Sequence, residues 1–215
     1  MKLTKLSLII VILTFTSVIV LNSYSSEEIY NKMIKDVSPE EFAKLRIING
    51  FECYQDFVLT CMSEVTLSEL LEAYNNNILL PRWIPNGIKL VKIYYAKKTA
   101  LLIYCNRDLN PPRDNLFLDS NFTIQIYPST PVIPKNPKEP KYIKLTENMY
   151  AHIIEGKPYT NYTIRYEGKF IAQGIVDIPS PTVITFYYRG FAYIIRGYLD
   201  KETMIKIAKS MLQNT

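Results

Sequence analysis

The chain has 215 residues, with 25 Lys plus Arg, 20 Asp plus Glu, one His and three Cys. Hydrophobic residues make up 48% of it and charged residues 21%, which excludes a wholly disordered chain. Only one apolar run approaches the length of a membrane span, which excludes a protein with several spans. The length fits one ordinary domain with a short appendage.

The first 25 residues have the pattern of an export signal. Lys2 and Lys5 precede an uncharged stretch from 6 to 26. Its apolar part is longer than the usual core of a cleaved signal, about 7–15 residues, and just short of the ~20 of a full span. We predict an uncleaved signal anchor, with cleavage after Ser25 as the alternative. Basic flanks stay cytoplasmic, so residues 27 to 215 are predicted to be extracytoplasmic, either anchored or secreted.

The exported part carries only a weak positive charge. Without Lys2 and Lys5 it has 23 basic and 20 acidic residues. Nucleic-acid binding needs Lys and Arg clustered on one face, and the sequence shows no such cluster. The heavy use of Ile, Tyr, Lys and Asn suits an archaeal source.

Two further features agree with export. Asn121 and Asn161 begin Asn-x-Thr glycosylation patterns, although unmodified strand residues fit them equally well. Cys53 and Cys61 lie eight residues apart and could form a disulfide outside the cell, which leaves Cys105 as an odd thiol buried on a strand. The cysteine spacing does not fit a zinc site, and the only His is remote.

Residues 26 to 65 are predicted to form a helical neck before a sheet domain of residues 66 to 215. Ser38-Pro39-Glu40-Glu41 is typical of a helix start, with Ser38 as the cap. Thr66-Leu67-Ser68-Glu69 repeats the capping pattern and predicts a helix to about Tyr74. The apolar run 57 to 62 fits a helix or a strand.

Apolar and polar residues then alternate in short segments separated by turn residues, which favours an antiparallel sheet. Strands are predicted at 88–96, 100–106, 122–127, 142–145, 150–154, 162–166, 170–176, 182–188 and 191–196. Arg189-Gly190 indicates a two-residue hairpin. The loop 128–140 has five prolines at regular spacing, which predicts an extended path. A final helix is predicted after the cap Asp200, with an apolar face that packs on the sheet.

The order of these features resembles a known family of extracytoplasmic domains of unknown function. The resemblance covers about residues 66 to 213. It rests on Ile78-Leu79-Leu80-Pro81, Ile84-Pro85, Gly87 and Leu90, and on Gly190-Phe191-Ala192-Tyr193, Gly197, Leu199-Asp200, Glu202, Ile205, Ile207-Ala208 and Ser210-Met211. The family occurs in membrane-anchored bacterial and archaeal proteins, including sigma-factor regulators and lipoprotein-sorting-like proteins. It implies a twisted antiparallel sheet with a helix across it, and it supplies no catalytic residue.

No residue pattern indicates catalysis or a cofactor. A general base needs an orienting partner and a nucleophile, and the only His, His152, alternates with apolar positions on a predicted strand. The sequence has no Gly-x-Ser-x-Gly elbow, phosphate loop, Cys-x-x-Cys or His-Glu-x-x-His pattern. We therefore expect no catalytic, cofactor-binding or metal-binding residues, and a structural role for His152.

Tyrosines are the remaining feature of the strands. They crowd the hairpins as Tyr94-Tyr95, Tyr187-Tyr188, Tyr193 and Tyr198. Tyrosine has a high propensity for strands, which is enough to explain its abundance there. An aromatic sheet face could also bind a protein, a lipid or a glycan. We expect an α+β, non-enzymatic domain held at the membrane that acts in protein interaction or sensing. A lipid or hydrophobic-ligand carrier is the first alternative, and a surface hydrolase is the second.

Overall fold

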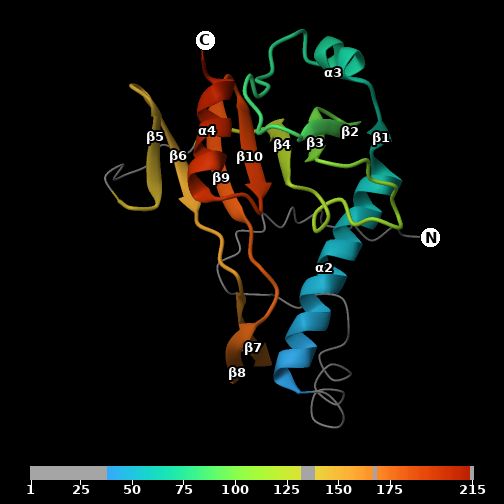
Figure 1. Cartoon of the computed structure of the whole chain (residues 1–215), viewed down its shortest axis with the longest axis vertical. Coiled ribbons are helices and arrows are strands. Elements are labelled where there is room, and N and C mark those ends of the chain that lie inside the picture. Colours follow the sequence, from blue (N-terminus) through green and yellow to red (C-terminus); the bar gives the residue numbers. More distant parts are fainter. Residues whose placement is uncertain (1–37, 132–138, 167–168, 214–215) are drawn as a thin grey trace, which may run out of the picture.

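The computed structural model describes residues 38–131, 139–166 and 169–213. It confirms an α+β fold with a large antiparallel sheet and a C-terminal helix (Figure 1). The predicted anchor, residues 1–25, and most of the proline-rich loop lie outside the described residues. Within the described residues, no helix has both the length and the apolar character needed to cross a bilayer.

The described residues form three helices and ten strands. The helices are α2 (Pro39–Cys61), α3 (Leu67–Ala73) and α4 (Lys201–Met211). The strands are β1 (Ser63–Glu64), β2 (Lys89–Ala96), β3 (Thr99–Cys105), β4 (Phe122–Pro128), β5 (Tyr142–Thr146), β6 (Met149–Ile154), β7 (Thr160–Tyr166), β8 (Lys169–Val176), β9 (Thr182–Tyr188) and β10 (Phe191–Gly197). The bounds of β2 to β10 agree with the nine predicted strands to within two residues, whereas β1 was not predicted.

Local signals in the sequence set the helix starts. The Ser38 side chain accepts a hydrogen bond from the Glu41 amide at 3.1 Å. Thr66 and Glu69 form the predicted capping box, and Asp200 accepts from the Thr203 amide at 2.9 Å. These side chains satisfy amides that a helix start otherwise leaves unpaired.

Eight strands form one sheet in the order β1-β2-β3-β4-β10-β9-β6-β5, with every pair antiparallel. The strands β7 and β8 pair with each other and continue the β6–β9 ribbon below the sheet (Figure 1). A single bridge between Lys157 and Ser180 joins the two parts of the ribbon. Prolines lack the amide that a ladder needs, so Pro158, Pro179 and Pro181 interrupt the ribbon there. We call the β7–β8 hairpin the arm.

The first face of the sheet packs against α3, α4 and the linker after α3. Met204, Ile207 and Ala208 of α4 are all 0% exposed, and so are Ile195 and Tyr193 beneath them. The Tyr193 hydroxyl accepts a hydrogen bond from the Leu79 amide at 3.1 Å, which attaches the linker to the core. Such complete burial stabilises the fold by about 1.5–3 kcal/mol for each large apolar side chain.

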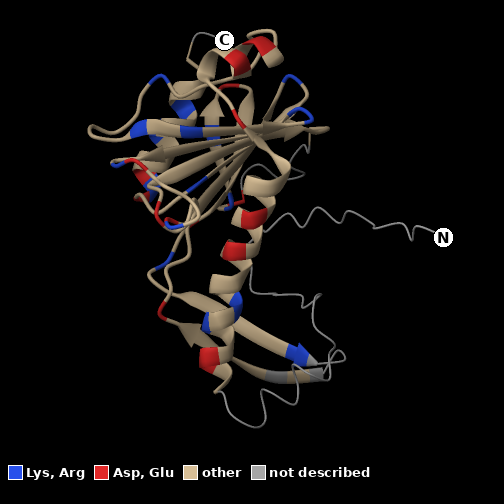
Figure 2. Ribbon diagram, turned by 90° about the vertical axis from the view of Figure 1, so that its right-hand side faces the viewer, with Lys and Arg blue, Asp and Glu red and all other residues tan. Residues whose placement is uncertain are grey.

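The second face packs against α2, the β3–β4 loop and the arm. The N-terminal half of α2 packs against the arm through residues such as Ala43 and Ile47, and its C-terminal half packs against β2 and β3 through Val58. Figure 2 shows this long helix running from the sheet down to the arm. Most of the predicted neck therefore forms a helix that is part of the second core, and the division of the chain at residue 65 stays a prediction.

The disulfide between Cys53 and Cys61 that the sequence left possible does not form within one chain of this fold. Both residues lie on α2, and both thiols are free and exposed. Eight residues of helix rise about 12 Å, whereas the Cα atoms of a disulfide lie within about 7 Å. The run 57 to 62 that the sequence left open between helix and strand forms the end of this helix. Cys105 is buried at the end of β3, as expected.

Candidate binding surface

The second face of the sheet carries a packed helix over only half of its width, although Ala192, Ile194 and Val183 in the other half are buried. The apolar side chains of β2 and β3 belong to the core beneath α2 and the β3–β4 loop. No side chain of β10, β9, β6 or β5 belongs to that core among the described residues. The strand order places these four strands together at one edge of the sheet. We call this half, which has no packed helix among the described residues, the uncovered half.

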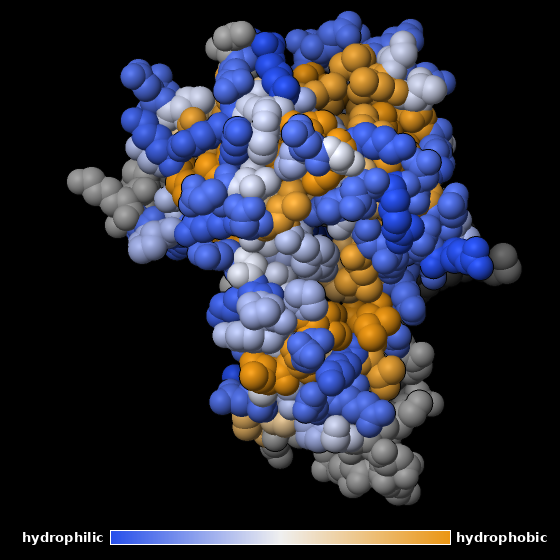
Figure 3. Space-filling model, viewed as in Figure 1, coloured by the Kyte–Doolittle hydropathy of each residue, from blue (hydrophilic) through white to orange (hydrophobic). Residues whose placement is uncertain are grey.

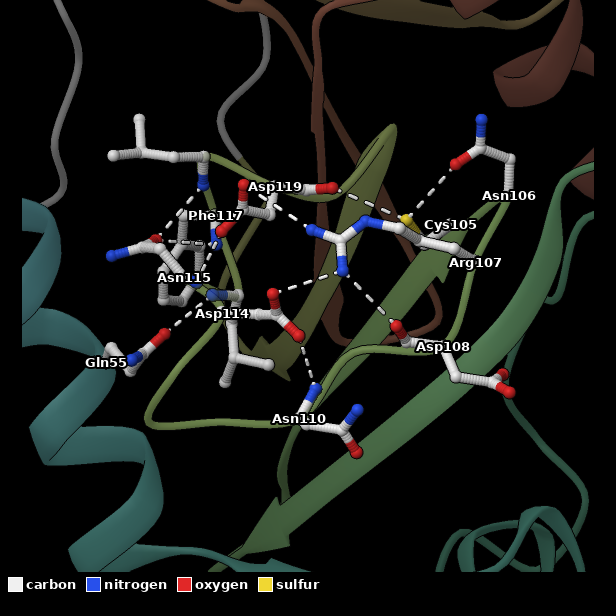
Figure 4. Close-up of polar contacts among 12 residues, drawn as sticks. Gln55, Cys105, Asn106, Arg107, Asp108, Asn110, Asp114, Asn115, Phe117 and Asp119 are labelled. Carbon is white, nitrogen blue, oxygen red and sulfur yellow. Dashed lines mark hydrogen bonds and ion pairs between the residues drawn. The ribbon is translucent and has the colours of Figure 1, made fainter.

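A network of hydrogen bonds holds the β3–β4 loop, residues 106–121, against α2 (Figure 4). The Arg107 guanidinium contacts Asp114 at 3.1 Å and Asp119 at 3.6 Å. Across from them, the buried Gln55 of α2 accepts a hydrogen bond from the Leu116 amide at 2.6 Å. These contacts fix α2 over the β2–β3 half of the face, and they fix the border of the uncovered half.

Aromatic side chains line the uncovered half, and their positions follow from the strand register. Tyr127 and Tyr187 both pair with Ala192 of β10, from opposite sides, so the three residues lie on one face. In the neighbouring row, His152 pairs with Thr185 and with Tyr142. Tyr150 lies two residues before His152 on the same face. We define the tyrosine face as Tyr127, Tyr142, Tyr150, His152 and Tyr187.

The side chains of the tyrosine face are partly open to solvent. Tyr150 is 37% exposed, and the other four are half-buried. The rings of Tyr142 and His152 meet edge to face, with centroids 5.5 Å apart. Burial, helped by the nearby Lys141, lowers the pKa of His152, so its ring is neutral at pH 7. A neutral imidazole among tyrosines offers hydrogen bonds and flat apolar area.

The border with α2 is polar and buried. Burial lowers the pKa of Arg196, which projects from β10 beside the Tyr54 and Tyr198 rings. Burial also raises the pKa of Tyr54, although Arg196 and a hydrogen bond to Gln125 act against the rise. Burial likewise raises the pKa of Tyr127, whose hydroxyl lies near those of Tyr187 and Tyr54. The phenols therefore stay protonated and can donate hydrogen bonds over the usual pH range.

A small cavity of about 220 Å³ lies at the end of β10. Its lining residues are Leu118, Ser120, Asn121, Pro179, Tyr198 and Leu199. Ligand pockets usually enclose about 300–1,000 Å³, so this cavity is too small for a lipid chain or a nucleotide. Within the described part of the chain, the buried Tyr198 hydroxyl has no hydrogen-bond partner.

The two predicted glycosylation acceptors lie in different surroundings. Asn121 is half-buried, and its side-chain oxygen accepts a hydrogen bond from the Asn106 amide at 2.8 Å. Asn161 is exposed on the outer side of the arm, opposite Ile175. The structure therefore leaves Asn161 open to a modifying enzyme and engages Asn121 in the fold. Neither asparagine belongs to the tyrosine face.

Sequence reasoning missed two residues that shape this region. Arg196 lies on the face of β10 opposite Tyr193 and Ile195, where alternation predicts a side chain directed away from the first core, so nothing in the strand pattern indicated its surroundings. Gln55 carried no signal either, because a polar residue on one side of a helix is ordinary. Among the described residues, no group of acidic, Cys and His side chains is arranged to hold a metal ion.

Comparisons with protein-family models, with curated proteins and with solved structures found no match to this chain. The resemblance of residues 66 to 213 to the extracytoplasmic domain family therefore stays a prediction. The functional argument rests on the geometry of the chain itself.

Proposed function

We propose that this chain is a non-enzymatic, membrane-anchored extracytoplasmic module that binds a protein partner through the tyrosine face. The observation that carries the proposal is the uncovered half of the second sheet face, where tyrosines gather beside a helix that leaves them open. Tyrosine is enriched at protein interfaces because it combines a large apolar area with a polar tip. The proposed location outside the cytoplasm, at the membrane, rests on the predicted export signal of residues 1–25.

The charges around the tyrosine face indicate the kind of partner. Lys144 lies at its β5 edge and pairs directly with Tyr150, while the neighbouring Lys141 forms an ion pair with Glu139 at 2.7 Å. A complementary surface would carry apolar side chains at its centre and carboxylates at its rim. We therefore expect a protein partner whose contact surface is apolar and acidic.

The packing of the first face counts against the lipid-carrier alternative. A lipid held between the sheet and α4 needs an open cavity, but Met204, Ile207 and Ala208 fill that space at 0% exposure. The cavity at the end of β10 is smaller than a usual ligand pocket. A lipid on this protein would have to bind on an outer surface.

The hydrolase alternative depends on His152. Its described neighbours are Tyr142, Lys141 and Thr185, the residue that pairs with His152 across β6 and β9. A hydrolase would need the Thr185 hydroxyl, or another nucleophile, hydrogen-bonded to His152. If His152→Ala removed a hydrolytic activity of the exported protein, this alternative would replace the binding module.

Site-specific photocrosslinking tests the partner. A photoreactive phenylalanine analogue placed at Tyr150 of the full chain should form a covalent adduct with one protein in intact cells. The matched control is Tyr159, a half-buried tyrosine at the root of the arm. Equal adducts at both positions, or none at Tyr150, would contradict the proposal. A lipid adduct at Tyr150 would favour the carrier instead.

Membrane fractionation tests the location separately. The full chain should stay in the membrane after alkaline extraction, and its intact mass should include residues 1 to 25. External protease should digest the region after residue 27 in intact cells. A soluble protein that begins at residue 26 would indicate the cleaved, secreted form.

A further inference from the structure

The exposed side of α2 carries two thiols placed symmetrically about an aromatic ring. Cys53, Phe57 and Cys61 are spaced four residues apart, so each lies about 6 Å along the helix from the next. Both cysteines are exposed, and Phe57 is 48% exposed. An α-helix turns about 40° beyond a full turn over four residues, so the three side chains share one stripe of the helix.

Toward the N-terminus of α2, the same stripe continues at a residue without a side chain. Gly50, the only glycine of α2, lies almost in line with Phe57 at this helical spacing. A Cβ at Gly50 would meet nothing within 4 Å. A glycine in the middle of a helix costs about 1 kcal/mol relative to alanine, yet no packing within the chain requires it here. Figure 3 shows hydrophobic side chains over α2 and the arm below the sheet.

We propose that a second copy of this chain docks on the stripe, antiparallel to the first, and that two disulfides join Cys53 of each chain to Cys61 of the other. A two-fold axis beside Phe57 places the partner's Cys61 at the height of Cys53, and the partner's Phe57 against Phe57. Such a contact is self-complementary, which is the requirement for a two-fold dimer. Rows of residues four apart align on facing helices when the helices cross at about 50°.

Charge and shape favour the antiparallel pairing over the parallel one. A parallel pair brings Asp56 of α2 against the partner's Asp56 and aligns the two helix dipoles, whereas the antiparallel pair opposes the dipoles. The helix α2 ends at the wide sheet and begins at the narrow arm (Figure 1). The antiparallel pairing therefore places the sheet of each copy beside the arm of the other.

The bonds, rather than the buried area, must hold this dimer. The facing helical segments run only from residue 53 to 61 in each chain. A buried phenylalanine contributes roughly 150–250 Å², whereas a stable interface buries about 800 Å² on each partner. The noncovalent contact alone is too small, so reduction should return the protein to monomers.

The chemistry needs a thiol oxidant. In each bond, Cys53 and the partner's Cys61 lose two protons and two electrons as the sulfur–sulfur bond forms. The disulfide of the oxidant, such as glutathione disulfide or an extracytoplasmic thiol oxidase, takes them up and becomes two thiols. Only the availability of such an oxidant in the cell rests on the proposed extracytoplasmic location, since the geometry is a property of the chain.

Oxidation of the purified full chain in mild detergent with glutathione disulfide tests the inference independently of location. We expect a covalent dimer on a non-reducing gel that dithiothreitol converts to monomer, with Cys53 linked to Cys61 in peptide maps. Cys53→Ser and Cys61→Ser should each lower the yield of covalent dimer at least tenfold, because like cysteines then lie about 12 Å apart along the helix pair. The buried Cys105→Ser is the control and should dimerise normally.

Mixing the two single variants is the sharpest part of the test. A chain that keeps Cys61 and a chain that keeps Cys53 should restore a covalent heterodimer with one bond, although neither variant dimerises alone. A wild-type protein that stays monomeric under oxidation would overturn the inference. Linkage of Cys53 to Cys53, or of Cys61 to Cys61, would overturn it too. Both positions are exposed, so these variants should fold, which circular dichroism verifies.

Discussion

The two faces of the eight-stranded sheet are covered in different ways. The first face lies under α3, α4 and a linker, and its large apolar side chains are fully buried. The second face has a mixed cover, in which the buried Gln55 and the half-buried Arg196 accompany the apolar core, and the tyrosine face remains partly exposed. Under the proposed function, the first face provides stability and the tyrosine face is the one that binds the partner.

The largest expected effect comes from a close approach of two strands. A Cβ at Gly197 on β10 would lie 2.5 Å from the Phe122 Cβ and 2.6 Å from the Asn121 carbonyl oxygen. Gly197→Ala should therefore lower the free energy of unfolding by at least about 3 kcal/mol, because backbone atoms must move. Gly50→Ala is the matched control and should raise it by up to about 1 kcal/mol through helix propensity. Urea unfolding measures both, and a loss from both would contradict this account.

The same truncation on the two faces should have different costs. Ile207→Ala on α4 removes a fully buried side chain between two rigid layers, and we expect a loss of about 3–5 kcal/mol. Ile47→Ala on α2 should cost about 2–3 kcal/mol, because the arm beneath it is a two-stranded hairpin that can relax. Equal costs in chemical denaturation would show that the two cores are equally rigid.

Gln55 should matter for the attachment of α2. Gln55→Leu keeps the volume but leaves the Leu116 amide buried without its acceptor, which should cost about 1–3 kcal/mol. Gln173→Leu, at an exposed position on β8, is the control and should change stability little. Hydrogen exchange at the Leu116 amide should rise in the first variant only. Unchanged exchange there would mean that another group accepts this hydrogen bond.

The smallest expected effect is a pH dependence from the tyrosine face. Burial, then Lys141, lowers the pKa of His152 in the folded state below its ordinary 6.5. As the pH falls, His152 therefore becomes protonated in the unfolded chain before it does so in the folded chain. Its contribution to the free energy of unfolding is complete above pH 6.5 and is lost as the pH falls from 6.5 to the lower pKa of the folded state. His152→Gln should flatten the stability curve between about pH 7.5 and 5.5. If the free energy of unfolding of His152→Gln depended on pH in that range as strongly as that of the wild type, another group would cause the dependence.

Local signals in the sequence predicted most of the elements. Caps such as Ser38, Thr66 and Asp200 act through neighbouring amides, and strand alternation depends only on the chain itself, so both could be read directly. The placement of α2 could not be read, because the run 57 to 62 fits a helix or a strand until its packing is known. The possible disulfide between Cys53 and Cys61 could not be judged from the sequence for the same reason.

The strand order and the site depend on contacts between distant residues. Residues 157 to 181 were expected to continue the series of strands, but prolines such as Pro158 and Pro179 divide the ribbon and free the arm. The tyrosine face joins β4, β5, β6 and β9, which the chain order alone does not place side by side. The abundance of tyrosine could be read from the sequence, whereas the gathering of five aromatic residues on an open face could not.

Hydroxyl-radical footprinting of the tyrosines tests the central claim most directly. In the purified full chain, Tyr142, Tyr150 and Tyr187 of the tyrosine face should be oxidised readily, whereas the buried Tyr104 and Tyr193 of the first core should be protected. In native membranes, the face should become protected while the other exposed residues stay reactive, because the partner then covers it. Equal labelling of the face with and without the membrane would contradict the account.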